Sequence, residues 1–125
     1  MDRKVLYIED NEQNLYLITF ILEAKGYEVL QARSGEEGVE MAGRSHPDMI
    51  LLDIQLPGMD GYEIARRLRL NPELASTPLV AVTSYAMVGD REKALGAGCN
   101  GYIEKPINPE TFVAQIEHFL FKKDS

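Results

Sequence analysis

Several kinds of residue and segment are scarce in this sequence, and each shortage excludes a class of protein. The single cysteine, Cys99, has no partner for an internal disulfide and favours a reducing compartment. No apolar run approaches the roughly 20 residues that a membrane-spanning helix needs. The opening residues, Met1 to Lys4, lead directly into an apolar strand pattern, so we expect no secretory signal. These shortages predict a cytoplasmic protein without membrane contact.

Positive charge is also scarce. The chain has 13 Lys and Arg residues against 20 Asp and Glu residues, which gives a formal net charge of −7. This balance argues against nucleic acid as a direct partner, because phosphate backbones bind to positively charged surfaces. A solvated acidic surface explains most of the glutamates. Carboxylates that cluster usually hold a cation, so the positions of individual acids decide what the excess means.

The sequence has no internal repeat, low-complexity stretch or linker. A chain of 125 residues with 45% hydrophobic and 26% charged residues has the size and composition of one globular domain with one core region. We therefore expect a single domain over residues 1–125.

The sequence does contain a regular alternation of short apolar runs and longer amphipathic segments. Strands that alternate with helices of this length form βαβ units with right-handed crossovers and a parallel sheet. Five such pairs predict a doubly wound α/β fold of the flavodoxin-like kind, with strand order 2-1-3-4-5 and helices on both faces. The expected strands are 4–9, 27–31, 48–53, 78–83 and 101–104, and the expected helices are 12–25, 35–44, 60–70, 87–97 and 109–121.

Capping residues mark the helix boundaries. Ser34, Asp60 and Asn108 each precede a predicted helix, and each is followed by a glutamate in the first turn. Gly26 and Gly98 are placed to end two other helices.

Polar residues follow four of the predicted strands at the point where each strand ends. Glu9 and Asp10 end the first strand, and Asp53 ends the third. Thr83 ends the fourth strand, and Lys105 follows the fifth. The carboxyl ends of parallel strands meet at one edge of a sheet, and the switch point of this topology lies between the first and third strands. We therefore expect the three acids to converge.

Three carboxylates in one cleft stay ionised only if a cation lies among them. Hard oxygen ligands without Cys or paired His nearby favour Mg²⁺ over zinc or copper, and Mg²⁺ commonly bridges carboxylate to phosphate. Lys105 and the Thr83 hydroxyl come from neighbouring strand ends. Such a group suits phosphoryl transfer, in which a carboxylate can itself be the nucleophile.

Each of these residues also has an ordinary interpretation. An Asp at a strand end is often a turn or helix cap, although Asn11 is available to cap the first helix. A single Thr or Lys at a strand end is unexceptional, and Tyr102 is most simply an aromatic residue at the edge of the core. The combination on four strands is what favours a site. Three remaining side chains are isolated and receive no role: His46, His118 and Cys99.

In four segments the chain resembles the receiver domain of two-component response regulators, and the similarity covers essentially all 125 residues. The spacing from Asp53 through Thr83 to Lys105 fits that family. Within the family, the chain looks closest to the single-domain, DivK-like regulators. The matching segments are YIEDN from Tyr7, ILLDIQLPGMDG from Ile50, VAVTS from Val80 and GYIEKP from Gly101.

The resemblance implies a role for each acid. Asp53 would accept a phosphoryl group from a phosphohistidine on a sensor histidine kinase or a histidine phosphotransfer protein. Mg²⁺ would bind Asp53, Asp10 and the backbone carbonyl of Gln55 directly, and Glu9 through water.

The resemblance also implies a switch. Lys105 would pair with the phosphoryl oxygens, and its bond to Pro106 is a candidate cis peptide. Thr83 would move to hydrogen-bond the phosphoryl group, and Tyr102 would turn from an exposed to an inward rotamer, since a charge of nearly −2 can reset local packing. The surface of the fourth helix, fifth strand and fifth helix would then change its downstream protein partner.

The first helix is apolar over a wider arc than an amphipathic surface helix needs. Leu17 and Ile21 lie beside its core-facing residues, and Phe20 lies further round. Two explanations are open: a wide buried face, or a patch that docks a partner. As a hypothesis, Asn14 forms with Leu17 and Ile21 part of the surface that docks the phosphodonor.

We expect a phosphoacceptor switch that promotes its own phosphotransfer and slow dephosphorylation, rather than an enzyme. Two other functions remain open. An aspartyl-phosphate hydrolase would use the same chemistry, but the short loops leave little material for a substrate pocket. A flavin-binding module would share the fold, but the loops lack the aromatic and hydroxyl residues expected around a flavin. The context is open too: Met1 favours a complete short regulator over a receiver module from a hybrid kinase or longer regulator.

Overall fold

The parallel sheet predicted from the alternation is present. The computed structural model describes residues 3–56, 60–84 and 89–121. The five strands are all paired in parallel, in the order β2-β1-β3-β4-β5, which confirms the predicted fold class and strand order. The strands are β1 (Lys4–Ile8), β2 (Glu28–Ala32), β3 (Met49–Asp53), β4 (Leu79–Thr83) and β5 (Gly101–Glu104).

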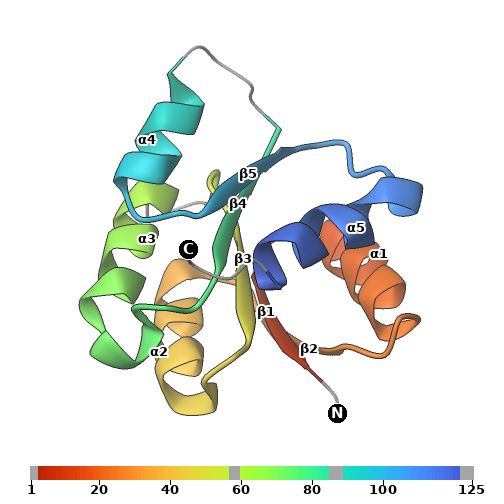
Figure 1. Cartoon of the computed structure of the whole chain (residues 1–125), viewed down its shortest axis with the longest axis horizontal. Coiled ribbons are helices and arrows are strands. Elements are labelled where there is room, and N and C mark those ends of the chain that lie inside the picture. The colour runs from red at the N-terminus through yellow and green to blue at the C-terminus, as the bar shows by residue number, and fades with distance from the viewer. Residues whose placement is uncertain (1–2, 57–59, 85–88, 122–125) are drawn as a thin grey trace.

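Helices cover both faces of the sheet. In Figure 1, α1 and α5 lie on one side, and α2, α3 and α4 lie on the other. None of the helices in the described part of the chain is long and apolar enough to cross a membrane. The helices are α1 (Glu12–Glu23), α2 (Gly35–Ser45), α3 (Gly61–Leu70), α4 (Asp90–Gly96) and α5 (Pro109–Leu120).

Two helical details differ from the expectation. A short 3-10 helix, η1 (Pro72–Leu74), follows α3 and was not predicted; Asn71 caps it by accepting a hydrogen bond from the Glu73 amide. The helix expected from residue 87 is described from Asp90 onward, and residues 87 and 88 lie outside the described residues.

The sheet separates two hydrophobic cores. Successive strand residues point to opposite faces, so Leu6 and Ile8 pack toward α2, α3 and α4, whereas Val5 and Tyr7 pack toward α1 and α5. Every residue of β3 and β4 is buried, as expected for central strands covered on both faces. Only the ends of these strands can therefore present polar groups to a ligand.

The predicted capping residues start the helices. Ser34, Asp60 and Asn108 each accept a backbone hydrogen bond from the first turn of the following helix, at 2.9–3.2 Å. Asn11 caps α1 in the same way. The Asp10 carboxylate is therefore not needed as the cap, and it is exposed at the carboxyl edge of the sheet.

Arg69, near the end of α3, joins several segments at the amino edge of the sheet. Its guanidinium donates to the carbonyls of Leu74 and Thr77 at 2.7 Å and of Gly98 at 2.8 Å, and to Asn100 Oδ1 at 2.7 Å. The chain just after α4 is therefore tied to α3 and to the segment that leads into β4.

Candidate functional site

Two neighbouring strands bring three carboxylates together. Because β1 pairs with β3, Glu9 and Asp10 lie beside Asp53 at the carboxyl edge of the sheet. Each acid offers one oxygen within 4.8 Å of the others. Glu9 and Asp53 are buried, with only 1% and 3% of their surface exposed, whereas Asp10 is exposed. The predicted convergence is confirmed, with the site open to solvent on the Asp10 side.

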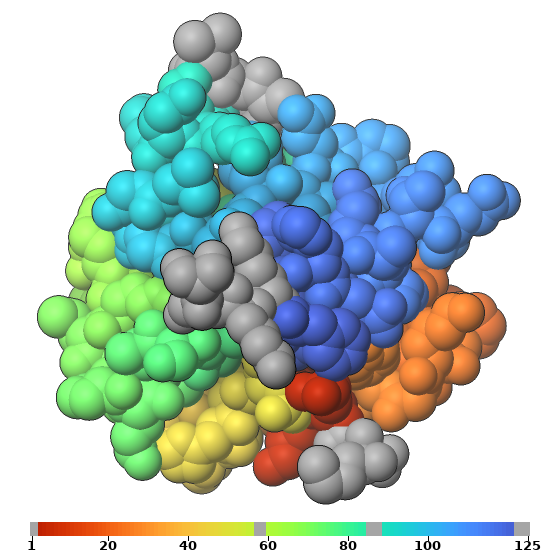
Figure 2. All heavy atoms as spheres, in the orientation of Figure 1, coloured from red at the N-terminus to blue at the C-terminus, as the bar shows by residue number. Residues whose placement is uncertain are grey.

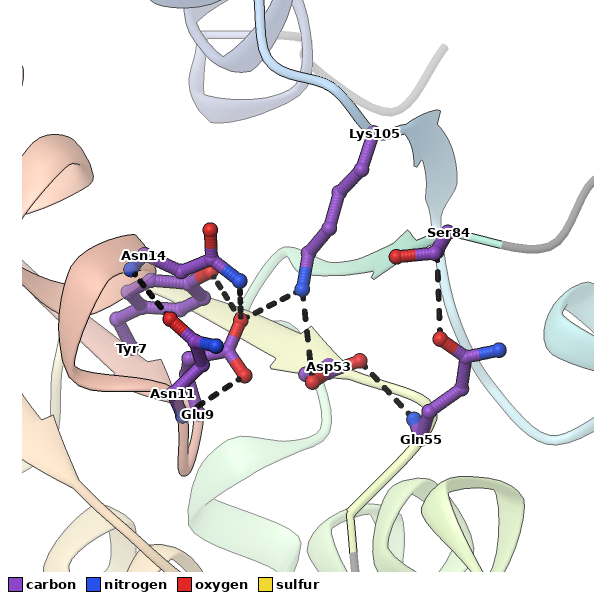
Figure 3. Close-up of polar contacts among 8 residues, drawn as sticks. All are labelled: Tyr7, Glu9, Asn11, Asn14, Asp53, Gln55, Ser84 and Lys105. Atoms are coloured by element: carbon purple, nitrogen blue, oxygen red, sulfur yellow. Dashed lines mark hydrogen bonds and ion pairs between the residues drawn. The ribbon is translucent and has the colours of Figure 1, made fainter.

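Lys105 lies across the two buried acids, as Figure 3 shows. Its Nζ is 2.6 Å from Glu9 Oε1 and 3.5 Å from Asp53 Oδ2. The peptide bond between Lys105 and Pro106 is cis, as predicted. The Lys105 amide also donates to the Thr83 carbonyl at 2.7 Å, which fixes the end of β5 to the end of β4. The Lys105 ammonium group is therefore held between the two buried acids, while its pairing with phosphoryl oxygens stays a prediction.

Glu9, which the sequence predicts only as a metal ligand, also accepts several hydrogen bonds within the protein. Besides Lys105, the Tyr7 hydroxyl donates to Glu9 Oε1 at 2.8 Å and Asn14 Nδ2 donates to the same oxygen at 3.2 Å. The Asn11 amide donates to the other oxygen, Oε2, at 3.3 Å. The sequence interpretation placed Tyr7 only in an apolar strand and Asn14 only on a docking surface, so both contacts are new.

The pKa values of the two buried acids, Glu9 and Asp53, are shifted in opposite directions. Burial disfavours the charged form of Glu9, but hydrogen bonds from Asp53, Lys105 and Tyr7 outweigh it and lower its pKa to about 2. Burial, followed by the hydrogen bond to Glu9, raises the pKa of Asp53 to about 7. Burial and the neighbouring Glu9 also raise the pKa of Tyr7, so its hydroxyl keeps its proton. Below about pH 7, the pair therefore favours a negative charge on Glu9 and a proton on Asp53.

Gln55 orients the carboxylate of Asp53. The Gln55 amide donates to Asp53 Oδ1 at 3.0 Å, and the Gln55 side chain accepts from the Ser84 amide at 3.4 Å. These contacts link the loop after β3 to the end of β4. The role of the Gln55 backbone carbonyl as a metal ligand stays a prediction.

Thr83 and Tyr102 lie together beside this group. Thr83 is buried at the end of β4, which pairs with β3 on one side and β5 on the other. Tyr102 on β5 is half-buried, and its side chain interacts with that of Thr83. Burial and the nearby Asp90 charge raise its pKa, and the interaction with Thr83 opposes this. The predicted pair is adjacent, while the change of rotamer stays a prediction.

The side chains without a predicted role lie in ordinary surroundings. His46 ends α2 in a left-handed conformation, and its Nε2 is 3.9 Å from a carboxylate oxygen of Glu73. His118 packs edge-on against Phe119. Cys99 is buried, and burial raises its pKa to about 11, so its thiol stays protonated.

The site fits a small divalent cation. Three carboxylates meet with one lysine, so the charge of the group is not balanced when all three acids are ionised. The available ligands are carboxylate oxygens, which suit Mg²⁺, and the exposure of Asp10 leaves room for the water ligands that Mg²⁺ retains.

Comparisons with known proteins agree with this geometry. Residues 5–117 match the family described as the response regulator receiver domain. The chain is 43% identical over 120 residues to the polar-differentiation response regulator DivK of Brucella ovis, an alignment that covers 96% of this chain and 98% of that protein. DivK of Brucella anthropi is 42% identical over the same length, with the same coverage.

Solved structures show the same fold. The receiver domain of the sensor histidine kinase PA1611 from Pseudomonas aeruginosa, with a magnesium ion coordinated in its active-site cleft, superimposes with a TM-score of 0.89 at 33% identity and covers 98% of this chain and 100% of that chain. The chemotaxis protein CheY4 of Vibrio cholerae superimposes with a TM-score of 0.91 at 27% identity, covering 95% of this chain and 99% of that chain. The chain thus belongs to the response regulator receiver domain family, the phosphoacceptor switches of two-component signalling.

Proposed function

We propose that Asp53 accepts a phosphoryl group from a phosphohistidine on a histidine kinase or a histidine phosphotransfer protein, and that residues 1–125 act as one receiver domain. One observation carries this proposal: the buried Asp53 carboxylate lies among two further acids, and Lys105 Nζ is 3.5 Å from its Oδ2. Phosphoryl transfer depends mainly on positioning and charge neutralisation, which this group supplies at an open edge of the sheet.

Mg²⁺ is the cofactor that the acids fit. Asp10, Asp53 and the Gln55 carbonyl would hold it directly, and Glu9 would hold it through water. When bound, the ion neutralises charge on the acids and on the incoming phosphoryl oxygens. The magnesium in the PA1611 receiver domain supports this assignment.

The transfer itself requires few groups. An oxygen of Asp53 attacks phosphorus, the P–N bond to the donor imidazole breaks, and the bonding pair stays on the imidazole nitrogen. Lys105 is placed to pair with the phosphoryl oxygens as they arrive, because its Nζ already contacts Asp53. The Thr83 hydroxyl, at the neighbouring strand end, donates a hydrogen bond to the group after transfer.

The output surface consists of α4, β5 and α5, and a downstream protein partner binds there. Figure 2 shows α4 in cyan and α5 in blue on the same exposed face. A groove of about 310 Å³ runs between these elements. Tyr102 lines this groove and its side chain also interacts with Thr83, so a movement of Thr83 toward the phosphoryl group would be felt at the groove through Tyr102. The residues that line it are Arg91, Tyr102, Ile103, Gln115, His118 and Phe119.

The phosphodonor docks on the flank of α1 beside the site. Leu17 is 38% exposed and Phe20 is 63% exposed, whereas Ile21 is half-buried against the core. The apolar face of α1 therefore includes both residues packed in the core and residues exposed at the surface. Asn14 lies at the same flank, and its side chain contacts Glu9, so the docking flank adjoins the acids.

The chain acts as a switch and not as a turnover enzyme, and its cytoplasmic location is part of the proposal, supported by the buried free thiol of Cys99. A hydrolase would release phosphate repeatedly from a phosphate ester. A switch would retain one phosphoryl group per chain after incubation with a small phosphodonor.

The test is phosphorylation by acetyl phosphate with Mg²⁺, followed by intact-mass measurement of the wild type, Asp53→Asn and Asp48→Asn. Asp48 is an exposed acid immediately before β3, so it is a control acid at the opposite end of the strand from Asp53. The wild type and the Asp48 variant gain one phosphoryl group, and the Asp53 variant gains none. A mass increase that survives Asp53→Asn would remove Asp53 from the central role.

A further inference from the structure

Tyrosine is an unexpected residue type at position 7. It is fully buried on the α1 and α5 side of the sheet, among aliphatic and aromatic residues such as Leu15 and Phe112. A hydroxyl in such a core costs free energy unless it has a hydrogen-bond partner, and Phe would fill nearly the same space without that cost. The hydroxyl of Tyr7 has a partner, because it donates to Glu9 Oε1 at 2.8 Å.

Strand geometry makes this contact possible. Residues two apart on a strand point to the same face, so Tyr7 and Glu9 both point toward α1. Asn14, on the first turns of α1, approaches Glu9 from the helix and donates to the same oxygen at 3.2 Å. Figure 3 shows the Tyr7 ring and the Asn14 amide on one side of this carboxylate, with Lys105 on the other.

The two carboxylate oxygens of Glu9 accept hydrogen bonds from different donors. Oε1 receives hydrogen bonds from Tyr7, Asn14 and Lys105, at 2.8, 3.2 and 2.6 Å. Oε2 receives the Asn11 amide at 3.3 Å. When Lys105 turns to the phosphoryl group, as the proposed function requires, Tyr7 and Asn14 remain to hold Oε1.

We propose that Tyr7 and Asn14 are positioning residues for Glu9: they hold its Oε1 on the α1 side and thereby fix the carboxylate for its water-mediated contact with Mg²⁺. This inference rests on the proposed function of the site. Partners of this kind, which orient a metal-binding group without touching the metal, commonly change metal affinity by about 10- to 100-fold. We expect about threefold to tenfold here, since Glu9 contacts the ion through water.

The length of the acid is part of the inference. Aspartate at this position would be shorter by one carbon–carbon bond of about 1.5 Å, which would carry its carboxylate out of hydrogen-bonding reach of the Tyr7 hydroxyl. The Tyr7 hydroxyl therefore matters only while residue 9 is Glu. A double-mutant cycle between positions 7 and 9 measures this dependence.

The experiment measures Mg²⁺ affinity by isothermal titration calorimetry for the wild type, Tyr7→Phe, Glu9→Asp and the double variant. Tyr7→Phe weakens Mg²⁺ binding by about threefold to tenfold, whereas in the Glu9→Asp background the same change has an effect below about twofold. Asn14→Leu, which keeps the volume and removes the donor, weakens binding in the same direction. With acetyl phosphate as donor, Tyr7→Phe raises the Mg²⁺ concentration needed for half-maximal labelling and leaves the maximal rate nearly unchanged.

Tyr27→Phe is the matched control. Tyr27 is also a buried tyrosine whose hydroxyl donates to a carboxylate, Glu117 Oε2, at 2.6 Å, but the pair lies at the other end of the molecule. This variant leaves Mg²⁺ affinity unchanged.

The outcomes separate the two proposals. If the wild type binds Mg²⁺ and Tyr7→Phe binds it equally well, Tyr7 has only a structural role and this inference is overturned, while the proposed function stands. An equal effect of Tyr7→Phe with and without the Glu9→Asp substitution also overturns it. If the wild type itself binds no Mg²⁺, the proposed function fails and takes the inference with it.

Discussion

At the scale of single residues, Asp53 is a buried acid whose ionisation is disfavoured by its surroundings. Its pKa is raised to about 7 in the fold by burial and by Glu9, whereas in an unfolded chain it is near its ordinary value of about 4. Between these two values, the folded protein holds a proton that the unfolded chain has lost. The free energy of unfolding therefore falls as pH rises from about 4 to about 7. The lowered pKa of Glu9 acts in the opposite direction but at lower pH, as pH falls toward about 2.

Asp53→Asn removes this titration. In EDTA, we expect the variant to be more stable than the wild type above about pH 7, by about 1 to 3 kcal/mol, and the difference to shrink toward about pH 5. Urea denaturation at several pH values, followed by circular dichroism, measures both proteins. Added Mg²⁺ stabilises the wild type more than the variant. Parallel pH profiles without metal would contradict a raised pKa for Asp53.

At the scale of elements, the start of α3 is held against the end of β3 by a close approach. A Cβ built on Gly61 would lie 2.5 Å from the Cα of Ile54, so no side chain fits there. Ile54 follows Asp53 directly, and the Gly61 amide donates to the Ile54 carbonyl at 3.2 Å. The glycine therefore sets how near α3 lies to β3, the strand that ends at the proposed phosphoacceptor Asp53.

Gly61→Ala should destabilise the fold by about 1 to 3 kcal/mol, because backbone atoms must move to relieve the contact. Gly43→Ala is the control: Gly43 lies in α2, and its nearest neighbour, an Asn71 side-chain nitrogen, would be 3.5 Å from the new Cβ. That variant should gain roughly 0.5 to 1 kcal/mol from helix propensity. Thermal and urea unfolding compare the two, and equal stabilities would show that α3 is free to shift.

A separate prediction concerns the flank of α1, where we expect the phosphodonor protein to dock. Leu17→Glu should slow phosphoryl transfer from the cognate kinase by about tenfold or more, since an apolar contact is replaced by a charge that must be desolvated. Labelling by acetyl phosphate should be unchanged. Leu70→Glu, on the 80% exposed end of α3, serves as the control and should leave both rates unchanged. Unchanged kinase transfer in the Leu17 variant would remove this flank from the docking surface.

At the scale of the whole molecule, Thr83 and Tyr102 lie between Asp53, the proposed phosphoacceptor, and the groove between α4 and α5. Beryllofluoride with Mg²⁺, which stands in for the phosphoryl group, should shift the NMR resonances of Tyr102 and of residues that line the groove. Thr83→Ala should keep Mg²⁺ binding and reduce these shifts by more than half, because the hydroxyl that senses the group is missing. Shifts of full size in that variant would mean that the signal travels by another route.

The sequence predicted the sheet order and the convergence of the acids because both follow from local patterns. Alternating elements specify the topology, and the topology brings the ends of β1 and β3 together. The hydrogen bond from Tyr7 to Glu9 was not predicted, because Tyr7 lies in an apolar run and was interpreted only as a strand residue. The spacing of two residues between Tyr7 and Glu9 places both side chains on one face, and this could have indicated the contact. The bonds of Arg69 to Gly98 and Asn100 join residues 29 and 31 positions apart, and no local pattern reports them.

The anchoring of α4 by Arg69 limits how this helix can respond. The guanidinium holds the chain at Gly98 and Asn100, just beyond the carboxyl end of the helix, to α3 and to the entry of β4. The opposite end begins at Asp90, nearer the acids, where Tyr62 donates to the Asp90 carboxylate over a longer 3.4 Å. The Arg69 contacts therefore limit how far the carboxyl end of α4 can move, and we expect any displacement of this helix to be smallest near Gly98.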